Sequence, residues 1–139
     1  MSSEAILQPV FIVALLNTVM CVWMYVTRIP AMSKAGITPE NATRESMQSL
    51  PPEVVRVADN YNHLFEQPTL FYAVVLSIAV LGHVDAVAVG CAWFYAALRI
   101  VHSLVQATVN HIPTRFSVFS LSWLVLAILI VRESLRLFG

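Results

Sequence analysis

The fold is decided by the stretch from Ala5 to Val26, which reads AILQPVFIVALLNTVMCVWMYV and contains no charged side chain. As a helix rising ~1.5 Å per residue, this stretch is roughly 33 Å long and crosses the ~30 Å hydrocarbon core of a bilayer. A cleaved signal peptide has a basic leading segment and a shorter apolar run of about 7–15 residues, whereas here only Glu4 carries a charge before the run. We therefore predict a retained transmembrane helix.

Further apolar segments follow, so we predict an all-α fold, a bundle of four transmembrane helices in which residues 1–139 form a single membrane domain. The predicted helices cover about 5–27, 52–82, 86–109 and 115–135. A polar loop at 28–51 separates the first two, and the start signal Thr38-Pro39-Glu40 predicts a short surface helix over about 39–48. The second helix is longer than a bilayer is thick, so its first half should extend into water, and Pro68 should bend it.

The composition agrees with a membrane protein and excludes other classes. Charged residues make up 12% of the chain and hydrophobic residues 58%, whereas an ordinary soluble domain has roughly 25% charged residues. The formal net charge is zero, so the chain lacks the basic excess of a nucleic-acid binder. It is also too hydrophobic to be disordered. Cys21 and Cys91 lie in apolar runs, and we interpret them as small buried hydrophobic residues.

The Lys and Arg residues are unevenly distributed among the loops, and this predicts the orientation. One side of the membrane carries the first and third loops, and the other side has only Arg132 and Arg136. The cationic residues on or near the richer side are Arg28, Lys34, Arg44, Arg56 and Arg115. We predict that this richer side is cytoplasmic, which leaves both termini outside the cytoplasm.

Polar side chains recur at helical spacing on the second and third predicted helices, and each set forms one face. The face on the second helix comprises Arg56, Asp59, Asn60, His63, Glu66 and Gln67, and the face on the third comprises Arg99, His102, Ser103 and Gln106. The two helices are antiparallel neighbours joined by a short turn. Glu66 and Arg99 therefore fall within about 3 Å of the same depth, which predicts an ion pair between them.

These two polar faces have two interpretations. They could be structural, with side chains that satisfy one another between helices. They could instead form a cytoplasm-facing site for an anionic ligand, which we favour because arginines outnumber the nearby carboxylates of Asp59 and Glu66. The chain's four histidines have no metal-ligand spacing, so we predict no metal site.

The polar sequence on the second helix resembles a known family signature. RVADNYNHLFEQP at residues 56–68 is similar to the Arg, Asn, Glu and proline pattern of the MAPEG family, the membrane-associated proteins in eicosanoid and glutathione metabolism. LRIVHS at residues 98–103 is similar to the family's arginine-histidine segment. The chain length, the number of helices and the long first loop agree with this resemblance, which covers nearly the whole chain and is closest to divergent, bacterial-type members.

The resemblance implies a homotrimer that binds glutathione in clefts between subunits, open to the cytoplasm, in a bacterial inner membrane. The positions that match the family's ligand-binding residues are Arg28, Arg56, Asn62, Glu66, Arg99 and His102. Arginines bind the two carboxylates of glutathione, and Glu66 suits its amino group. A nearby cation stabilises the thiolate, and His111 or Arg115 is nearest to the catalytic position of the family.

Two functions follow as hypotheses. The first is a glutathione-dependent transferase or peroxidase that conjugates or reduces lipophilic electrophiles. The second is a non-catalytic membrane trimer that binds lipid or acts as an accessory subunit of a larger membrane complex with other membrane proteins. The second is motivated by Ile100, Leu104 and Gln106, which stand where family enzymes carry tyrosines.

Overall fold

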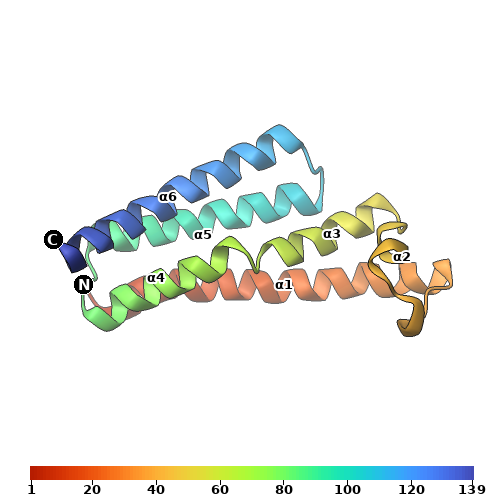
Figure 1. Ribbon diagram of the computed structural model, residues 1–139, viewed down its shortest axis with the longest axis horizontal. Coiled ribbons are helices and arrows are strands. Elements are labelled where there is room, and N and C mark those ends of the chain that lie inside the picture. Colours follow the sequence, from red (N-terminus) through yellow and green to blue (C-terminus); the bar gives the residue numbers. More distant parts are fainter.

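The structure, a computed structural model, describes all of residues 1–139 and is entirely helical (Figure 1). Its long helices are α1 (Ser3–Ala35), α3 (Pro52–His63), α4 (Gln67–Leu81), α5 (Ala86–Ala107) and α6 (Ile112–Phe138), and two short ones are η1 (Pro39–Asn41) and α2 (Arg44–Gln48). Four spans are long and apolar enough to cross a membrane: α1, α3 with α4, α5, and α6. The prediction of an all-helical protein with four apolar spans is confirmed.

The helices run side by side along one axis (Figure 1). Both termini and the α4–α5 turn lie together at one end, which we call the terminal end. The segment 36–51, with η1 and α2, lies at the other end, which we call the loop end. At the loop end α1 and α3 project beyond the α5–α6 turn, as the length of the second predicted helix implied.

Helix α1 is longer than predicted, because it continues past residue 27 to Ala35. Pro30 removes only one backbone hydrogen bond, and the residues around it include good helix formers such as Met32 and Lys34. The helix ends at Gly36, whose φ of 70° is left-handed and whose N–H donates to the carbonyls of Met32 and Ser33. The polar loop therefore begins at Gly36 rather than at residue 28.

The second predicted helix is broken rather than merely bent. Helix α3 ends at His63 and α4 begins at Gln67, so Leu64, Phe65 and Glu66 form a turn between them. Pro68 is the second residue of α4 and has no N–H to donate to the carbonyl of Leu64, which explains why the helix is interrupted at this place. The interruption changes which residues of α3 and α4 share a face.

The remaining bounds differ by a few residues. Helix α5 ends at Ala107 rather than at residue 109, and α6 runs over Ile112–Phe138 rather than 115–135, since Pro113 fits its first turn. The surface helix predicted over 39–48 is divided into η1 and α2, because Thr43 starts a new helix by accepting a hydrogen bond from the N–H of Ser46.

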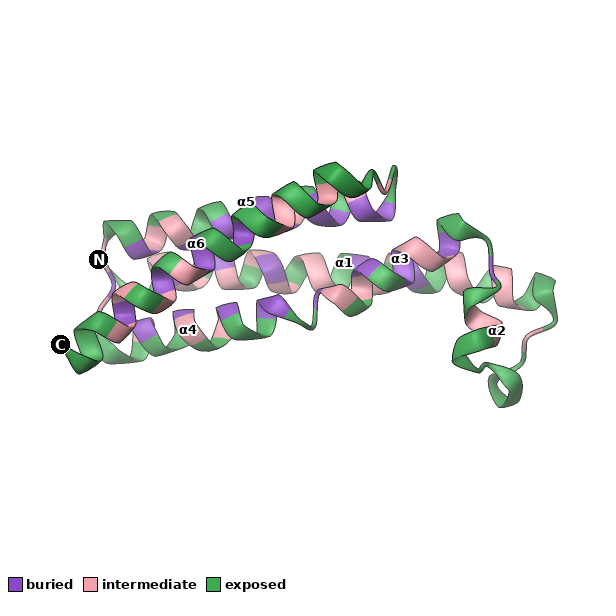
Figure 2. Ribbon diagram, turned by 45° about the horizontal axis from the view of Figure 1, so that its top comes forward, coloured by how far each residue is buried: buried purple, intermediate pink, exposed green.

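Two apolar clusters form the core. The larger one joins α1, α4, α5 and α6 toward the terminal end, around Phe71, Tyr95 and Leu126. The smaller one joins α1, α3 and α5 toward the loop end, around Met20 and Leu64. Large apolar side chains also cover the outer faces of the helices, where the exposed residues form long stripes (Figure 2). Such an apolar outer surface is expected where lipid rather than water surrounds the protein.

Candidate functional site

Between the two apolar clusters lies an interior polar cluster, to which α3, α4, α5 and α6 all contribute. Each of its members is buried within the chain, and Arg99 and Ser103 have no exposed surface at all. The members are Asn60, Gln67, Arg99, His102, Ser103, Gln106 and Ser122. The α5 residues follow the helical spacing of the sequence pattern, so the polar face predicted on this helix does point into the bundle.

Gln67 connects three helices at the centre of this cluster. Its Oε1 accepts hydrogen bonds from the hydroxyl of Tyr95 at 3.2 Å, from Nη1 of Arg99 at 3.2 Å and from the hydroxyl of Ser122 at 3.0 Å. Sequence reasoning placed Gln67 on the polar face but gave it no particular role. A glutamine directly before a proline carries no distinctive signal in one sequence.

The predicted ion pair between Glu66 and Arg99 is wrong. Glu66 is exposed and takes part in none of the ion pairs of the structure, and Arg99 instead donates to the neutral amide of Gln67. The break at 64–66 turns Glu66 outward. The prediction assumed one continuous helix. Because the helix is interrupted, the direction in which Glu66 points no longer follows from that assumption.

The polar face predicted on the second helix is divided in the structure. Asn60 and Gln67 face the interior, whereas Asp59 and Glu66 are exposed. Polar residues expected to form one surface therefore form two. The outward surface is available to another molecule or subunit.

The guanidinium of Arg99 lacks a charged partner. Only Nη1 makes a hydrogen bond, while Nε and Nη2 are buried with no acceptor within the chain. Nε2 of Gln67, both ring nitrogens of His102, the hydroxyl of Ser103 and Oε1 of Gln106 are also buried without partners. Buried polar groups are nearly always paired in native proteins, and most stringently in a membrane. The cluster therefore has spare capacity to bind water or an anionic ligand.

Two histidines and an aromatic ring border the cluster on the side of the α5–α6 turn. The ring of His63 lies 5.1 Å from that of His102 and 5.2 Å from that of Phe119, centroid to centroid. Nδ1 of His63 has no hydrogen-bond partner. No group of histidine, cysteine or acidic side chains has the arrangement of a metal site.

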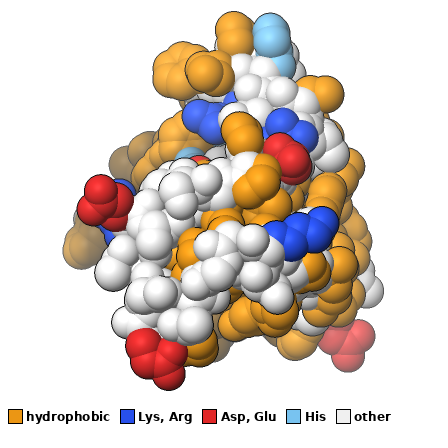
Figure 3. Space-filling view, turned by 90° about the vertical axis from the view of Figure 1, so that its right-hand side faces the viewer, with side chains coloured by type: hydrophobic (Ala, Val, Ile, Leu, Met, Phe, Trp, Pro, Cys, Tyr) orange, Lys and Arg blue, Asp and Glu red, His pale blue; other side chains and the backbone are white.

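Arg28 and Asn62 meet at the loop end, away from Arg99. Together with Asp59 and residues of α2 and α3 they line a small pocket of about 30 Å³. Nη1 of Arg28 lies 3.8 Å from the sulfur of Met24 and makes no ion pair. Arg56 is half-buried, and its Nε has no partner. Seen from the loop end, cationic and anionic side chains are interspersed with apolar ones rather than gathered in one patch (Figure 3).

The two residues nearest to a catalytic position are both engaged in the turn between α5 and α6. Nδ1 of His111 lies 2.7 Å from the hydroxyl of Thr114, and Nη1 of Arg115 donates to Oδ1 of Asn110 at 2.8 Å. Asn110 has a positive φ of 49°, which asparagine tolerates better than most residues. These contacts hold the turn together and leave His111 exposed.

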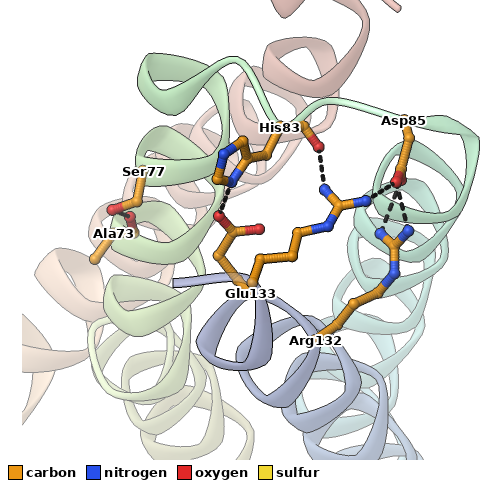
Figure 4. A network of polar contacts seen from close by, with 7 residues as sticks. Ala73, Ser77, His83, Asp85, Arg132 and Glu133 are labelled. Atoms are coloured by element: carbon orange, nitrogen blue, oxygen red, sulfur yellow. Dashed lines mark hydrogen bonds and ion pairs between the residues drawn. The ribbon is translucent and has the colours of Figure 1, made fainter. Parts of the chain in front are cut away.

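A second polar network closes the terminal end and was not foreseen from the sequence (Figure 4). Arg132 and Arg136 of α6 both bind the carboxylate of Asp85, and Glu133 contacts Nδ1 of His83. Arg136 also donates to the carbonyl of His83. The hydrogen bond from Arg132, followed by that from the N–H of Ala88, holds the pKa of Asp85 well below its usual range. A usable signal was present, since opposite charges occupy the same end of the bundle.

In a comparison with known protein families, the chain matches the model of the MAPEG family over residues 6–133. No curated protein and no solved structure matches the chain.

Proposed function

Because the chain belongs to the MAPEG family, we propose that it is a glutathione-dependent transferase or peroxidase of the membrane, acting on lipophilic electrophiles at a cytoplasm-facing site between subunits of a homotrimer. One observation carries the proposal. The guanidinium of Arg99 is buried in a membrane-spanning bundle and forms no ion pair with a carboxylate, and two of its nitrogens have no acceptor. A buried cation of this kind is costly unless an anion compensates it.

Glutathione fits the residues present. Its two carboxylates suit the guanidinium groups of Arg28, Arg56 and Arg99, which bind carboxylates through paired hydrogen bonds. Its ammonium suits Glu66, whose carboxylate is exposed and outside every ion pair of the chain. Glutathione, when bound, supplies the thiol that attacks the electrophile.

The roles of the other site residues follow from the atoms they leave free. The amide of Asn62 is exposed beside the pocket of Arg28 and can bind the peptide groups of glutathione. His102 has two ring nitrogens without partners and can donate to a ligand close to Arg99. His111 and Arg115 are the candidates for stabilising the thiolate, Arg115 because its cation lies in the first turn of α6, beside Asn110.

A site shared between subunits is supported by the exposure of two of its residues, Asn62 and Glu66. A ligand held by these side chains has one open side. The outer face of α1 exposes a stripe of large apolar side chains that either lipid or another subunit can cover, including Phe11, Leu15, Val19, Val22 and Val26. The homotrimer is part of the proposal for this reason.

The orientation is proposed from the charges of the loops. The loop end carries Arg28, Lys34, Arg44, Arg56 and Arg115, so we place it in the cytoplasm of a bacterial cell and both termini across the inner membrane. Arg132 and Arg136, the cationic side chains of the other end, are bound to Asp85.

A second function, a non-catalytic trimer that binds lipid or serves as a subunit of a larger membrane complex, is favoured by one specific observation. Arg115 and His111 are engaged within their own turn, to Asn110 and Thr114 respectively. A residue that stabilises a thiolate has to be free to face it. This second function shares the ligand site but not the chemistry.

Calorimetric titration with glutathione in mild detergent tests the site. The unchanged chain should bind at millimolar glutathione or below, and Arg99→Met should weaken binding at least tenfold because it keeps the apolar stem and removes the charge. Arg44→Gln, an exposed change in α2, is the matched control and should bind normally. No binding by a folded trimer of the unchanged chain contradicts the proposal.

Turnover separates the two functions. Conjugation of glutathione to a chromogenic aryl halide above the uncatalysed rate supports the transferase, and a further loss in Arg115→Gln supports the thiolate role. Binding without turnover, in a preparation that co-purifies with another membrane protein, supports the second function instead.

A further inference from the structure

A groove opens on the outer surface at the terminal end, far from the site described above. It lies between the start of α1 and the first third of α5 and has a volume of about 540 Å³, within the range of roughly 300–1,000 Å³ that is common for ligand pockets. It is lined by Glu4, Leu7, Gln8, Phe11, Ile12 and Trp93. Both walls belong to membrane-spanning helices, so lipid or another protein chain, rather than water, has to fill its apolar part.

The polarity of the groove changes in one direction along α1. Glu4 lies at the terminal end, Gln8 follows one helical turn deeper, and Phe11 and Ile12 lie deepest. The side chain of Gln8 makes no hydrogen bond in the chain, although it is exposed on a face that meets lipid. Trp93, 41% exposed, adds an indole N–H on the opposite wall. The order carboxylate, hydrogen-bond donors, apolar surface is complementary to an amphiphile.

The charge of the groove specifies the headgroup. Glu4 forms no ion pair, whereas the other acidic side chains of this end, Asp85 and Glu133, are bound to Arg132, Arg136 and His83. A second copy of the chain would bring no free arginine or lysine to Glu4, because both arginines of this end are already held by Asp85. The N-terminal ammonium of Met1 is the other cation of this end, and it forms no ion pair with Glu4. A membrane lipid with an ammonium headgroup supplies the missing cation.

We propose that this groove binds a phospholipid with a primary ammonium headgroup, of the phosphatidylethanolamine class. The ammonium donates to the carboxylate of Glu4, and the amide N–H of Gln8 and the indole N–H of Trp93 donate to the ester carbonyls of the lipid. An acyl chain covers Leu7, Phe11 and Ile12. This lipid site is independent of the proposed glutathione site, which lies toward the other end.

Native mass spectrometry of the delipidated full chain tests the headgroup preference. The chain is titrated separately with phosphatidylethanolamine, phosphatidylcholine and phosphatidylglycerol of identical acyl chains. Retention should be strongest for phosphatidylethanolamine, weaker for phosphatidylcholine, whose ammonium has no N–H, and weakest for the anionic lipid. Equal retention of the three lipids overturns the proposal.

Glu4→Gln is the decisive variant, and Glu40→Gln, an exposed change at the loop end, is its matched control. Glu4→Gln should reduce the preference for phosphatidylethanolamine over phosphatidylglycerol about threefold to fivefold, the size expected of one exposed charge pair. Glu40→Gln should leave the preference unchanged. If the preference survives Glu4→Gln, the lipid binds elsewhere and the assignment is overturned.

The place of the acyl chain is tested by fluorescence in vesicles that contain brominated phosphatidylethanolamine. Bromine near the groove should quench Trp93, and Trp93→Phe should remove the most strongly quenched part of the emission, leaving that of Trp23 and Trp123. Efficient disulfide formation between copies of a Phe11→Cys variant, above the background of Cys21 and Cys91, would show that a second copy fills the groove and would overturn the proposal.

Discussion

Replacing Gln67 by leucine should destabilise the bundle strongly, because one oxygen of this side chain accepts hydrogen bonds from three helix-borne donors. The substitution keeps most of the volume but leaves the hydroxyls of Tyr95 and Ser122 and Nη1 of Arg99 without this acceptor. Tyr95, Arg99 and Ser122 are fully buried, so water cannot replace the lost acceptor without entering the bundle.

The magnitude follows from the number of bonds. Ser122 can still donate to the carbonyl of Phe119 at 2.7 Å, so two donors, on Tyr95 and Arg99, lose their acceptor. Hydrogen bonds between membrane helices contribute about 0.6–1.7 kcal/mol each, so the change should cost about 1–3 kcal/mol of unfolding free energy. The upper part of this range is expected because one donor is a guanidinium. For Gln67→Glu we expect no loss of unfolding free energy. Nε2 of Gln67 has no partner, so this change loses no hydrogen bond and places a carboxylate beside Arg99.

The assay is equilibrium unfolding in mild detergent with increasing dodecyl sulfate, followed by tryptophan fluorescence at a fixed ratio of protein to detergent. Gln67→Leu should unfold at clearly lower dodecyl sulfate than the unchanged chain, and Gln67→Glu should be at least as stable as that chain. Gln48→Leu, an exposed change in α2, is the control and should have little effect. If Gln67→Leu is as stable as the control, or Gln67→Glu is as unstable as Gln67→Leu, the central role of Gln67 is refuted.

Three further predictions concern other parts of the bundle. The pKa of Asp85 is lowered in the folded chain, chiefly by Arg132. The ionised carboxylate therefore stabilises the fold fully above the unfolded pKa of about 3.9, and this stabilisation is lost as the pH falls below that value. The melting temperature of the unchanged chain should fall more steeply below pH ~4 than that of Asp85→Asn. Ala92→Leu should cost about 1–3 kcal/mol in the same unfolding assay, since Ala92 is fully buried where α5 packs in the core, and an undiminished stability would show that this packing is loose. Gly82→Ala should cost about 1 kcal/mol from its left-handed φ of 71° alone, because nothing lies within 4 Å of an added Cβ, and a stability loss of several kcal/mol in thermal unfolding would contradict that reasoning.

Much of the polar interior was predictable from spacing on a continuous helix. The segment of α5 from Arg99 to Gln106 contains no proline or glycine, so the directions of its side chains follow directly from 3.6 residues per turn. Its polar residues are buried together as one face. Residues of α3 and α4 were less predictable. Pro68 indicated a bend, but a bend and a break place Glu66 on different sides of the bundle, and spacing alone does not distinguish them.

The network at the terminal end shows a second limit of sequence reasoning. Asp85 is in a turn and Arg132 is 47 residues later in the chain, so no local pattern joins them. They were assigned to the same side of the membrane, yet the pairing depends on the rotation of α6 about its axis. That rotation is fixed by packing of α6 on α5 and α4 and not by the charges themselves.

The sequence by itself determined that this is a four-span helical membrane protein of the MAPEG type, because length, apolar composition and local motifs suffice for these properties. Only the tertiary structure decided which polar groups meet. It turned Glu66 outward, gave Arg99 a neutral amide in place of a carboxylate, and joined the α4–α5 turn to α6. Local chemistry sets where a helix begins and breaks, whereas the contacts of a side chain depend on the rotations of separate helices, and packing of the whole bundle fixes those together.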